Sequence, residues 1–152
     1  MDSSSRIYPP RPIVGVGGVV IENGRVLLIR RGAPPLQGKW SIPGGILEVG
    51  ELLTEGVQRE MREETGLDVG VLGLLEVFDR IVRDNDGRPL YHYVILDYLC
   101  EKIHGTARPG SDAVDVAWAG ADQIDQFRLT ETATRVVRNA FNGLQWGTAL
   151  AF

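Results

Sequence analysis

Several features that would mark particular classes of protein are scarce in this chain of 152 residues. A single cysteine, Cys100, excludes an internal disulfide, so a reducing cytoplasm is the compartment we expect. No apolar signal segment follows the polar start Met1–Ser5, and nothing in the composition suggests a lipid environment or a membrane partner. Because Cys100 lies in an apolar run, we expect it to be a core residue rather than a nucleophile.

Positive charge is also limited. The chain has 16 basic and 20 acidic residues, which give a net charge of -4, and no cluster of Lys and Arg stands out. A nucleic-acid backbone is held through many phosphate contacts, so this balance argues against a nucleic-acid partner. A small anionic substrate would instead need help from a bound cation. With 43% hydrophobic residues, the chain has the composition of an ordinary globular domain.

The pattern along the chain predicts one domain, residues 1–152, with residues 1–12 as a loose lead-in. Mostly strands with one central and one terminal helix favour an α+β fold, a mixed-sheet sandwich with helices outside. Asn23-Gly24 suits a tight hairpin turn. The expected strands are 13–21, 25–29, 68–79, 90–101 and 114–119, the expected helical segments are 54–65, 121–127 and 130–141, and the expected loop is 32–38.

The central helix carries the most informative residues. Thr54 could cap its start, and Gly66 could take the left-handed position after its last turn. On a helical wheel Glu60, Glu63 and Glu64 fall within an arc of about 100° on one side. The sequence therefore predicts three carboxylates on one helix face.

Such a face can be merely solvated, but like charges at this spacing repel and stabilise nothing unless a cation lies against them. Clustered carboxylate oxygens suit a hard cation, Mg²⁺ or Mn²⁺, that also binds substrate phosphates. The loop upstream strengthens this interpretation. Gly44-Gly45 would let a backbone carbonyl approach a metal without a Cβ in the way, and Glu48 and Glu51 add two more carboxylates.

These residues together resemble the Nudix box of the Nudix hydrolases. Gly45, Glu51, the run from Arg59 to Gly66 and Leu67 agree with the box at nine defined positions over 23 residues. The resemblance implies an αβα sandwich around a mixed sheet. It also implies a loop, helix and loop that hold Mg²⁺ or Mn²⁺ and catalyse hydrolysis of a pyrophosphate bond in a small nucleotide.

Carried over residue by residue, the resemblance makes Glu60, Glu63 and Glu64 metal ligands and the Gly44 carbonyl a further one. Arg59 and Glu51 would form an internal pair that steadies the loop. The general base differs between subfamilies, so Glu63 or Glu64 is one candidate and Asp112 the other. Three further residues are candidate substrate contacts, with a solvated strand end as the alternative for the arginines and core packing as the alternative for the tryptophan: Arg30, Arg31 and Trp40.

The substrate is less sharply indicated. The segment around Trp40 to Gly45 is similar to compact ADP-ribose pyrophosphatases, which favours ADP-ribose or a related nucleoside-diphosphate sugar. The proline-rich element of the longer ADP-ribose enzymes is missing, since residues 83–91 hold only Pro89. A nucleoside-triphosphate pyrophosphohydrolase is the alternative, and a catalytically silent nucleotide-sensing module is a third reading. Relatives often pair, so a homodimer is expected by analogy alone.

Overall fold

A computed structural model describes residues 6–143, and the polar start Met1–Ser5 and residues 144–152 lie outside the described part. One mixed sheet runs in the order β3-β2-β1-β6-β5, with β4 added to β1 and β7 to β2. The elements are β1 (Ile13–Glu22), β2 (Arg25–Arg31), β3 (Trp40–Ser41), β4 (Gly44–Ile46), α1 (Leu53–Thr65), β5 (Asp68–Arg83), β6 (Pro89–His104), β7 (Ala113–Gly120), η2 (Ile124–Phe127) and α2 (Glu131–Phe141).

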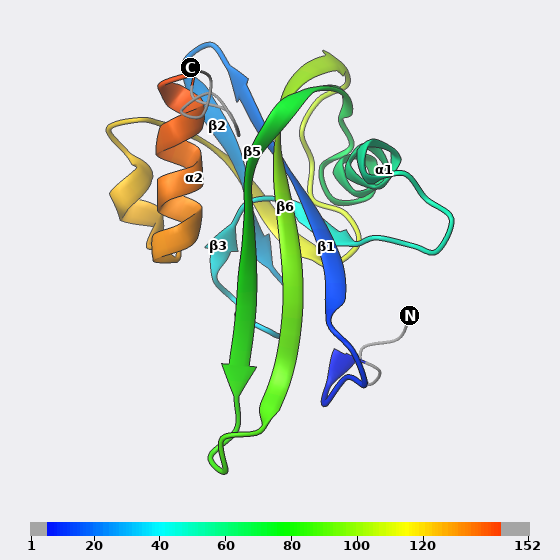
Figure 1. The fold of residues 1–152 in the computed structure, drawn as a ribbon. Helices are drawn as coiled ribbons and strands as arrows, with labels where there is room; N and C mark the ends of the chain where they lie inside the picture. Colours follow the sequence, from blue (N-terminus) through cyan, green and yellow to red (C-terminus); the bar gives the residue numbers. More distant parts are fainter. Residues whose placement is uncertain (1–5, 144–152) are drawn as a thin grey trace, which may run out of the picture.

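The sheet is covered from both sides, with α1 and α2 on opposite flanks (Figure 1). One cluster of buried apolar side chains lies beneath α1, around Val57 and Met61, and a second beneath α2, around Val136 and Val137. Cys100 belongs to the first cluster, which confirms the predicted core position. The α+β sandwich with a mixed sheet, expected from the pattern and the resemblance, is therefore the observed fold.

The first hairpin forms where it was predicted. Asn23 and Gly24 have φ angles of 53° and 75°, as a tight turn with two left-handed residues requires. Strand β1 pairs with β2 only beside this turn, at Ile21 and Glu22. Its earlier residues run parallel to β6, and Gly15 to Gly17 also pair antiparallel with β4. Strand β1 thus joins the two halves of the sheet at the centre of the molecule.

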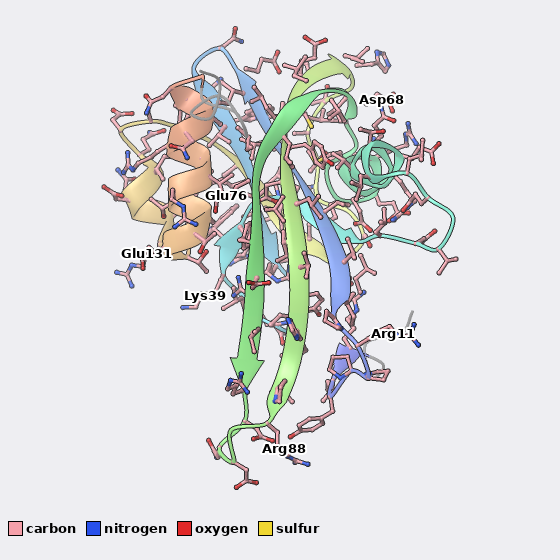
Figure 2. All side chains as sticks on the ribbon, in the orientation of Figure 1. Arg11, Lys39, Asp68, Glu76, Arg88 and Glu131 are labelled. Carbon is pink, nitrogen blue, oxygen red and sulfur yellow. The ribbon has the colours of Figure 1, made fainter. Side chains whose placement is uncertain are left out.

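Strands β5 and β6 form a hairpin that extends well beyond the rest of the sheet (Figure 1). The predicted range 68–79 ended β5 too early, because it pairs as far as Arg83 with Pro89, and the predicted range 90–101 ended β6 three residues before His104. Side chains near the turn are exposed or half-buried, so the apolar signal fades although the backbone ladder continues. Arg88, close to the turn, is labelled in Figure 2.

The lead-in is not loose over its described part. The Tyr8 N–H donates to the Leu90 carbonyl at 2.9 Å, and its hydroxyl donates to Asp84 at 2.7 Å. The Arg88 guanidinium lies 4.6 Å from the centre of the Tyr8 ring. Residues 6–12 are therefore fastened to the β5–β6 hairpin, a pairing between segments far apart in sequence that composition alone does not reveal.

The start of α1 differs from the prediction by one residue, and its cap is different. Leu52 is the capping position, and its N–H donates to the Glu55 carboxylate at 3.0 Å, whereas Thr54 lies inside the helix. The predicted end is confirmed, because Gly66 is left-handed with φ of 74° and its N–H returns to the Arg62 carbonyl. Near the C-terminus, 121–127 contains only the short η2, while α2 begins after Thr130 as predicted.

Within residues 6–143, no helix has the length and apolar character needed to cross a membrane.

Candidate active site

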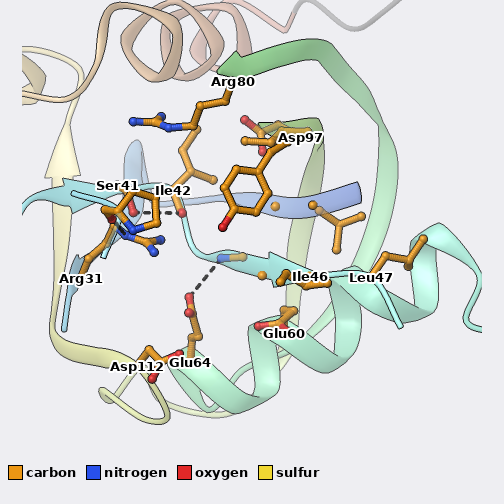
Figure 3. Close-up of a pocket in the computed structure, with 18 of the residues that line it drawn as sticks. Arg31, Ser41, Ile42, Ile46, Leu47, Glu60, Glu64, Arg80, Asp97 and Asp112 are labelled. Carbon is orange, nitrogen blue, oxygen red and sulfur yellow. Dashed lines mark hydrogen bonds between the residues drawn. The ribbon is translucent and has the colours of Figure 1, made fainter. Parts of the chain in front are cut away.

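A cavity of about 590 Å³ lies between α1, the short strands β3 and β4, and one face of the sheet. Figure 3 shows Glu60, Glu64 and Asp112 on one side of β4, and Arg80 and Asp97 on the other. Acidic groups thus border one part of the cavity, and the sheet face forms its other part.

Helix α1 presents its carboxylates to the cavity at different depths. Glu64 is only 5% exposed, and the side chains of Glu60 and Glu63 are 12% and 48% exposed. All three line the cavity, as the helical spacing predicted. Val57 and Met61 on the neighbouring stripe are fully buried against the sheet, which fixes how the helix is rotated.

Arg59 neutralises much of this negative charge. Its guanidinium makes two hydrogen bonds to Glu51, at 2.6 and 2.9 Å, so the expected internal pair is present. It also donates to Glu60 at 2.7 Å and to Glu63 at 3.2 Å. A further bond reaches the Ile46 carbonyl at 2.9 Å. The planar fork of one arginine therefore ties α1 to the loop before it, and the contact with Arg59 lowers the pKa of Glu51.

Glu64 has no such cationic partner among residues 6–143. Its carboxylate accepts a hydrogen bond of 3.0 Å from the Gly44 N–H, drawn as a dashed line in Figure 3. Burial raises the pKa of Glu64 to about 7, with help from the negative charges of Glu60 and Asp112, while the Gly44 hydrogen bond and the positive charge of nearby Arg31 act in the opposite direction. A cation bound against this carboxylate would lower its pKa further and favour the ionised form at neutral pH.

Both glycines before the helix are required by close packing. A Cβ at Gly44 would collide with the Val16 carbonyl oxygen, and a Cβ at Gly45 would collide with the Glu60 carboxylate. The sequence prediction had located the need for glycine correctly but assigned it only to metal approach. The role predicted for the Gly44 carbonyl stays a prediction, because the observed contact of Gly44 with Glu64 is through its N–H.

The loop before β7 is fastened to the end of α1. The Arg108 N–H donates to the Thr65 carbonyl at 2.9 Å, and the Gly110 N–H donates to the Glu64 carbonyl at 3.1 Å. At the far end of the loop, the Gly32 N–H donates to the Asp112 carbonyl at 2.6 Å. These bonds bring Asp112, which is 48 positions from Glu64 in sequence, to the rim of the same cavity.

Within the described residues, no three acidic, histidine or cysteine side chains form a ready-made metal cluster. Glu60, Glu63 and Glu64 share one helix face as predicted, but their carboxylates do not gather at one point, and their role as metal ligands stays a prediction. Like charges separate, so Glu60 and Glu63 turn to Arg59 and Glu64 turns to Gly44. The donor set nevertheless fits a hard cation, because carboxylate oxygens are the ligands that such cations prefer and the buried Glu64 forms no ion pair within residues 6–143.

Of the three candidate substrate contacts, two lie at the cavity and one does not. Arg31 and Trp40 line the cavity, whereas Arg30 does not and is exposed. The pairing of β2 with β7 is irregular between Arg30 and Arg31, and of the two side chains only Arg31 lies at the cavity. Trp40 also packs edge to face on Phe127, with ring centres 5.2 Å apart, so it is both a core residue and a cavity wall.

Sequence reasoning missed two arginines of the cavity wall. Arg6 and Arg80 line it, and the Nε of each is buried without a hydrogen-bond partner in the described structure. Burial, and then the nearby Arg31, lower the pKa of Arg80, so these two guanidinium groups lie close enough to repel. The signal available in sequence was an arginine within the apolar alternation of 68–83.

Asp97 was also missed. It lies in the middle of β6, is 4% exposed and lines the cavity floor. Burial and the neighbouring Glu76 raise the pKa of Asp97 to about 7. A lone carboxylate inside the aromatic and β-branched run 91–99 was the signal that could have identified it.

Comparison with known proteins agrees with this geometry. The model of the NUDIX domain matches residues 11–140, so the chain belongs to the Nudix hydrolase family, a family of pyrophosphohydrolases that generally use divalent metal ions. A MutT-like protein of Streptomyces ambofaciens is 35% identical over 136 residues, which cover 89% of this chain and 80% of that protein.

An ADP-ribose pyrophosphatase of Methanocaldococcus jannaschii is 37% identical over 116 residues, which cover 76% of this chain and 66% of that protein. The crystal structure of a MutT NUDIX hydrolase from Burkholderia pseudomallei superimposes with a TM-score of 0.73 at 30% identity, covering 84% of this chain and 97% of that one. The family, the fold and the enzymatic nature of the chain are thus established together.

Proposed function

We propose that this enzyme hydrolyses the pyrophosphate bond of a nucleoside diphosphate linked to another group, with ADP-ribose as the favoured substrate. The observation that carries the proposal is one cavity bordered by the carboxylates of α1, by Asp112 and by Arg6, Arg31 and Arg80, which form no ion pair with a carboxylate within residues 6–143. Its volume of about 590 Å³ lies within the range that encloses a nucleotide-sized ligand.

Each group has a distinct task in this proposal. Glu60 and Glu64 would hold Mg²⁺ or Mn²⁺. Glu63, which accepts a hydrogen bond from Arg59, would be a further ligand. A divalent cation bound there neutralises phosphate charge and makes the attacking water more acidic. Arg31 and Arg80 would hold phosphate oxygens, and the apolar walls exclude bulk water from the reacting bond.

The water's proton must pass to a carboxylate, and two candidates border the cavity. Asp112 stands on a loop fastened to α1 and faces the cavity rim, while Glu63 and Glu64 lie on the helix itself. We expect Asp112→Ala to lower kcat by about 10²–10⁴-fold, with little change in KM, if Asp112 is the base.

Asp115→Ala is the matched control, because Asp115 is an exposed carboxylate only three positions further along, outside the cavity. A change in KM alone for Asp112→Ala would assign Asp112 to binding and leave Glu63 or Glu64 as the base.

The name of the Methanocaldococcus relative supports ADP-ribose. Hydrolysis of a nucleoside triphosphate to the monophosphate and pyrophosphate is the alternative, and the arginines at the cavity wall favour it, since they could take a third phosphate. The silent-module reading is not favoured, because the acidic helix face, the Arg59 network and the cavity are all present.

A substrate panel with Mg²⁺ and product identification by mass separates these readings. ADP-ribose should give AMP and ribose 5-phosphate at a higher kcat/KM than any nucleoside triphosphate. Release of pyrophosphate from triphosphates as the dominant reaction would establish the alternative, and no turnover of any compound would contradict the proposal.

A further inference from the structure

The part of the cavity away from α1 is a regular face of the sheet. Alternate residues of β5 and β6 share this face and pair directly across the strands: Arg80 with Tyr93, Phe78 with Ile95, and Glu76 with Asp97. The floor therefore changes along the strands from a cationic row through an apolar row to an acidic row.

Strand β1 leaves this floor open. Its residues beside Ile95 and Asp97 are Gly15 and Gly17, and both glycines line the cavity. A Cβ at Gly17 would collide with the carboxylate of Asp97. Glycine at this position therefore leaves room for the Asp97 carboxyl at the surface of the cavity.

The Asp97 carboxyl is buried, faces a cavity and has no hydrogen-bond donor or basic side chain paired with it in residues 6–143. Glu76 opposite is different, since Arg135 of α2 holds it through two hydrogen bonds. An unpaired buried polar group costs free energy unless a ligand completes its hydrogen bonds. Asp97 is thus arranged as a ligand-binding group, not as part of an internal ion pair.

The ligand group beside Asp97 must be flat and largely apolar, because the adjacent row is Phe78 and Ile95 and the other wall includes Trp40 and Ala133. A nucleobase has this shape, whereas a ribose would bury hydroxyl groups against Phe78 and Ile95 without partners. With the diphosphate at the α1 carboxylates, the base is the part of the substrate that reaches the floor.

We propose that Asp97 selects the base, favouring adenine over guanine through a pair of hydrogen bonds in which its carboxyl both donates and accepts. This inference rests on the proposed function. A neutral carboxyl offers one O–H donor and one C=O acceptor, which match the amino group of adenine and the ring nitrogen beside it. The Watson–Crick edge of guanine presents two adjacent N–H donors, which suit an ionised carboxylate instead.

The surroundings stabilise the neutral carboxyl relative to that of an exposed aspartate. Burial raises its pKa first, and the negative charge of Glu76 adds to the effect. The other charged or titratable groups around it are Arg135 on Glu76, Arg80 and Tyr93 two rows along, and the Cys100 thiol on the opposite face of β6. The residue of β1 beside it is Gly17, which brings no charged or titratable group.

The test compares kcat/KM for ADP-ribose with that for GDP-ribose, which differ only in the base, and for ATP with GTP. The wild-type enzyme should prefer adenine. Asp97→Asn keeps one donor and one acceptor in nearly the same shape, so it should retain the preference. Asp97→Leu removes both and should reduce the adenine-to-guanine ratio by about ten- to a hundredfold, the discrimination of one paired hydrogen-bonding contact.

Asp79→Asn is the matched control, because Asp79 is exposed on β5, outside the cavity, and should leave the ratio unchanged. An unchanged ratio in Asp97→Leu, or a wild-type enzyme that prefers guanine, would overturn the inference. If Asp97→Leu does not fold, Asp97→Asn decides alone: it should retain the adenine preference, and loss of that preference would overturn the inference. If the enzyme hydrolyses only triphosphates, the proposed function is refuted. The ratio of kcat/KM for ATP to that for GTP then still tests the role of Asp97.

Discussion

Replacing Glu64 with glutamine should lower kcat by about two to three orders of magnitude while the protein remains folded. Glutamine retains the oxygen that accepts the Gly44 N–H, so the local packing is preserved. It removes the negative charge that a divalent cation needs, and stabilisation of charge in the transition state falls with it. Steady-state kinetics across a range of Mg²⁺ concentrations, with thermal melts alongside, measure both effects.

Glu101→Gln is the control for this substitution, because Glu101 is an exposed glutamate of β6 that does not line the cavity. It should leave turnover unchanged. Wild-type activity of Glu64→Gln at saturating Mg²⁺ would rule out Glu64 as a ligand or base, whatever the fold.

The second large effect is expected on stability. Arg59→Ala should lower the free energy of unfolding by about 3 kcal/mol, because it leaves the mostly buried carboxylates of Glu51 and Glu60 without their cation. Lysine at this position restores a charge but not the planar fork that bridges Glu51, Glu60 and the Ile46 carbonyl, so it should recover less than half of the loss. Urea denaturation at pH 7 gives these values.

Arg62→Ala provides the comparison on the same helix. Arg62 pairs with Asp68 at 2.8 Å, but both side chains are largely exposed to solvent, so its loss should cost less than about 1 kcal/mol. Equal losses in the two variants would show that the Arg59 network does not stabilise the loop and helix as described.

The carboxylate helix was predictable because its information is local. Helical spacing brings Glu60, Glu63 and Glu64 to one side whatever the rest of the fold, and Gly66 ends the helix through its own backbone freedom. The Nudix resemblance added the pair of Arg59 and Glu51, which are eight positions apart and meet through the turn of the loop.

The sheet side of the cavity was not predictable in the same way. Arg80 and Tyr93 meet through strand register, as do Asp97 and Gly17, and register depends on a backbone ladder that spans the molecule. Arg30 and Arg31 looked equivalent in sequence, and the shift in the β2–β7 pairing between them leaves no pattern from which the cavity residue could be chosen. The two- and three-residue strands β3 and β4 are too short to leave a periodic pattern.

The most direct test of the metal-dependent mechanism is a calorimetric titration of Mn²⁺ into the wild-type protein and into a Glu60→Gln, Glu64→Gln double variant, each with AMP present. The arrangement of α1 predicts saturable binding of at least one ion to the wild-type protein and at least about tenfold weaker binding to the variant. Equal affinities in the two proteins, or no detectable binding to the wild type, would contradict a cation site on these carboxylates.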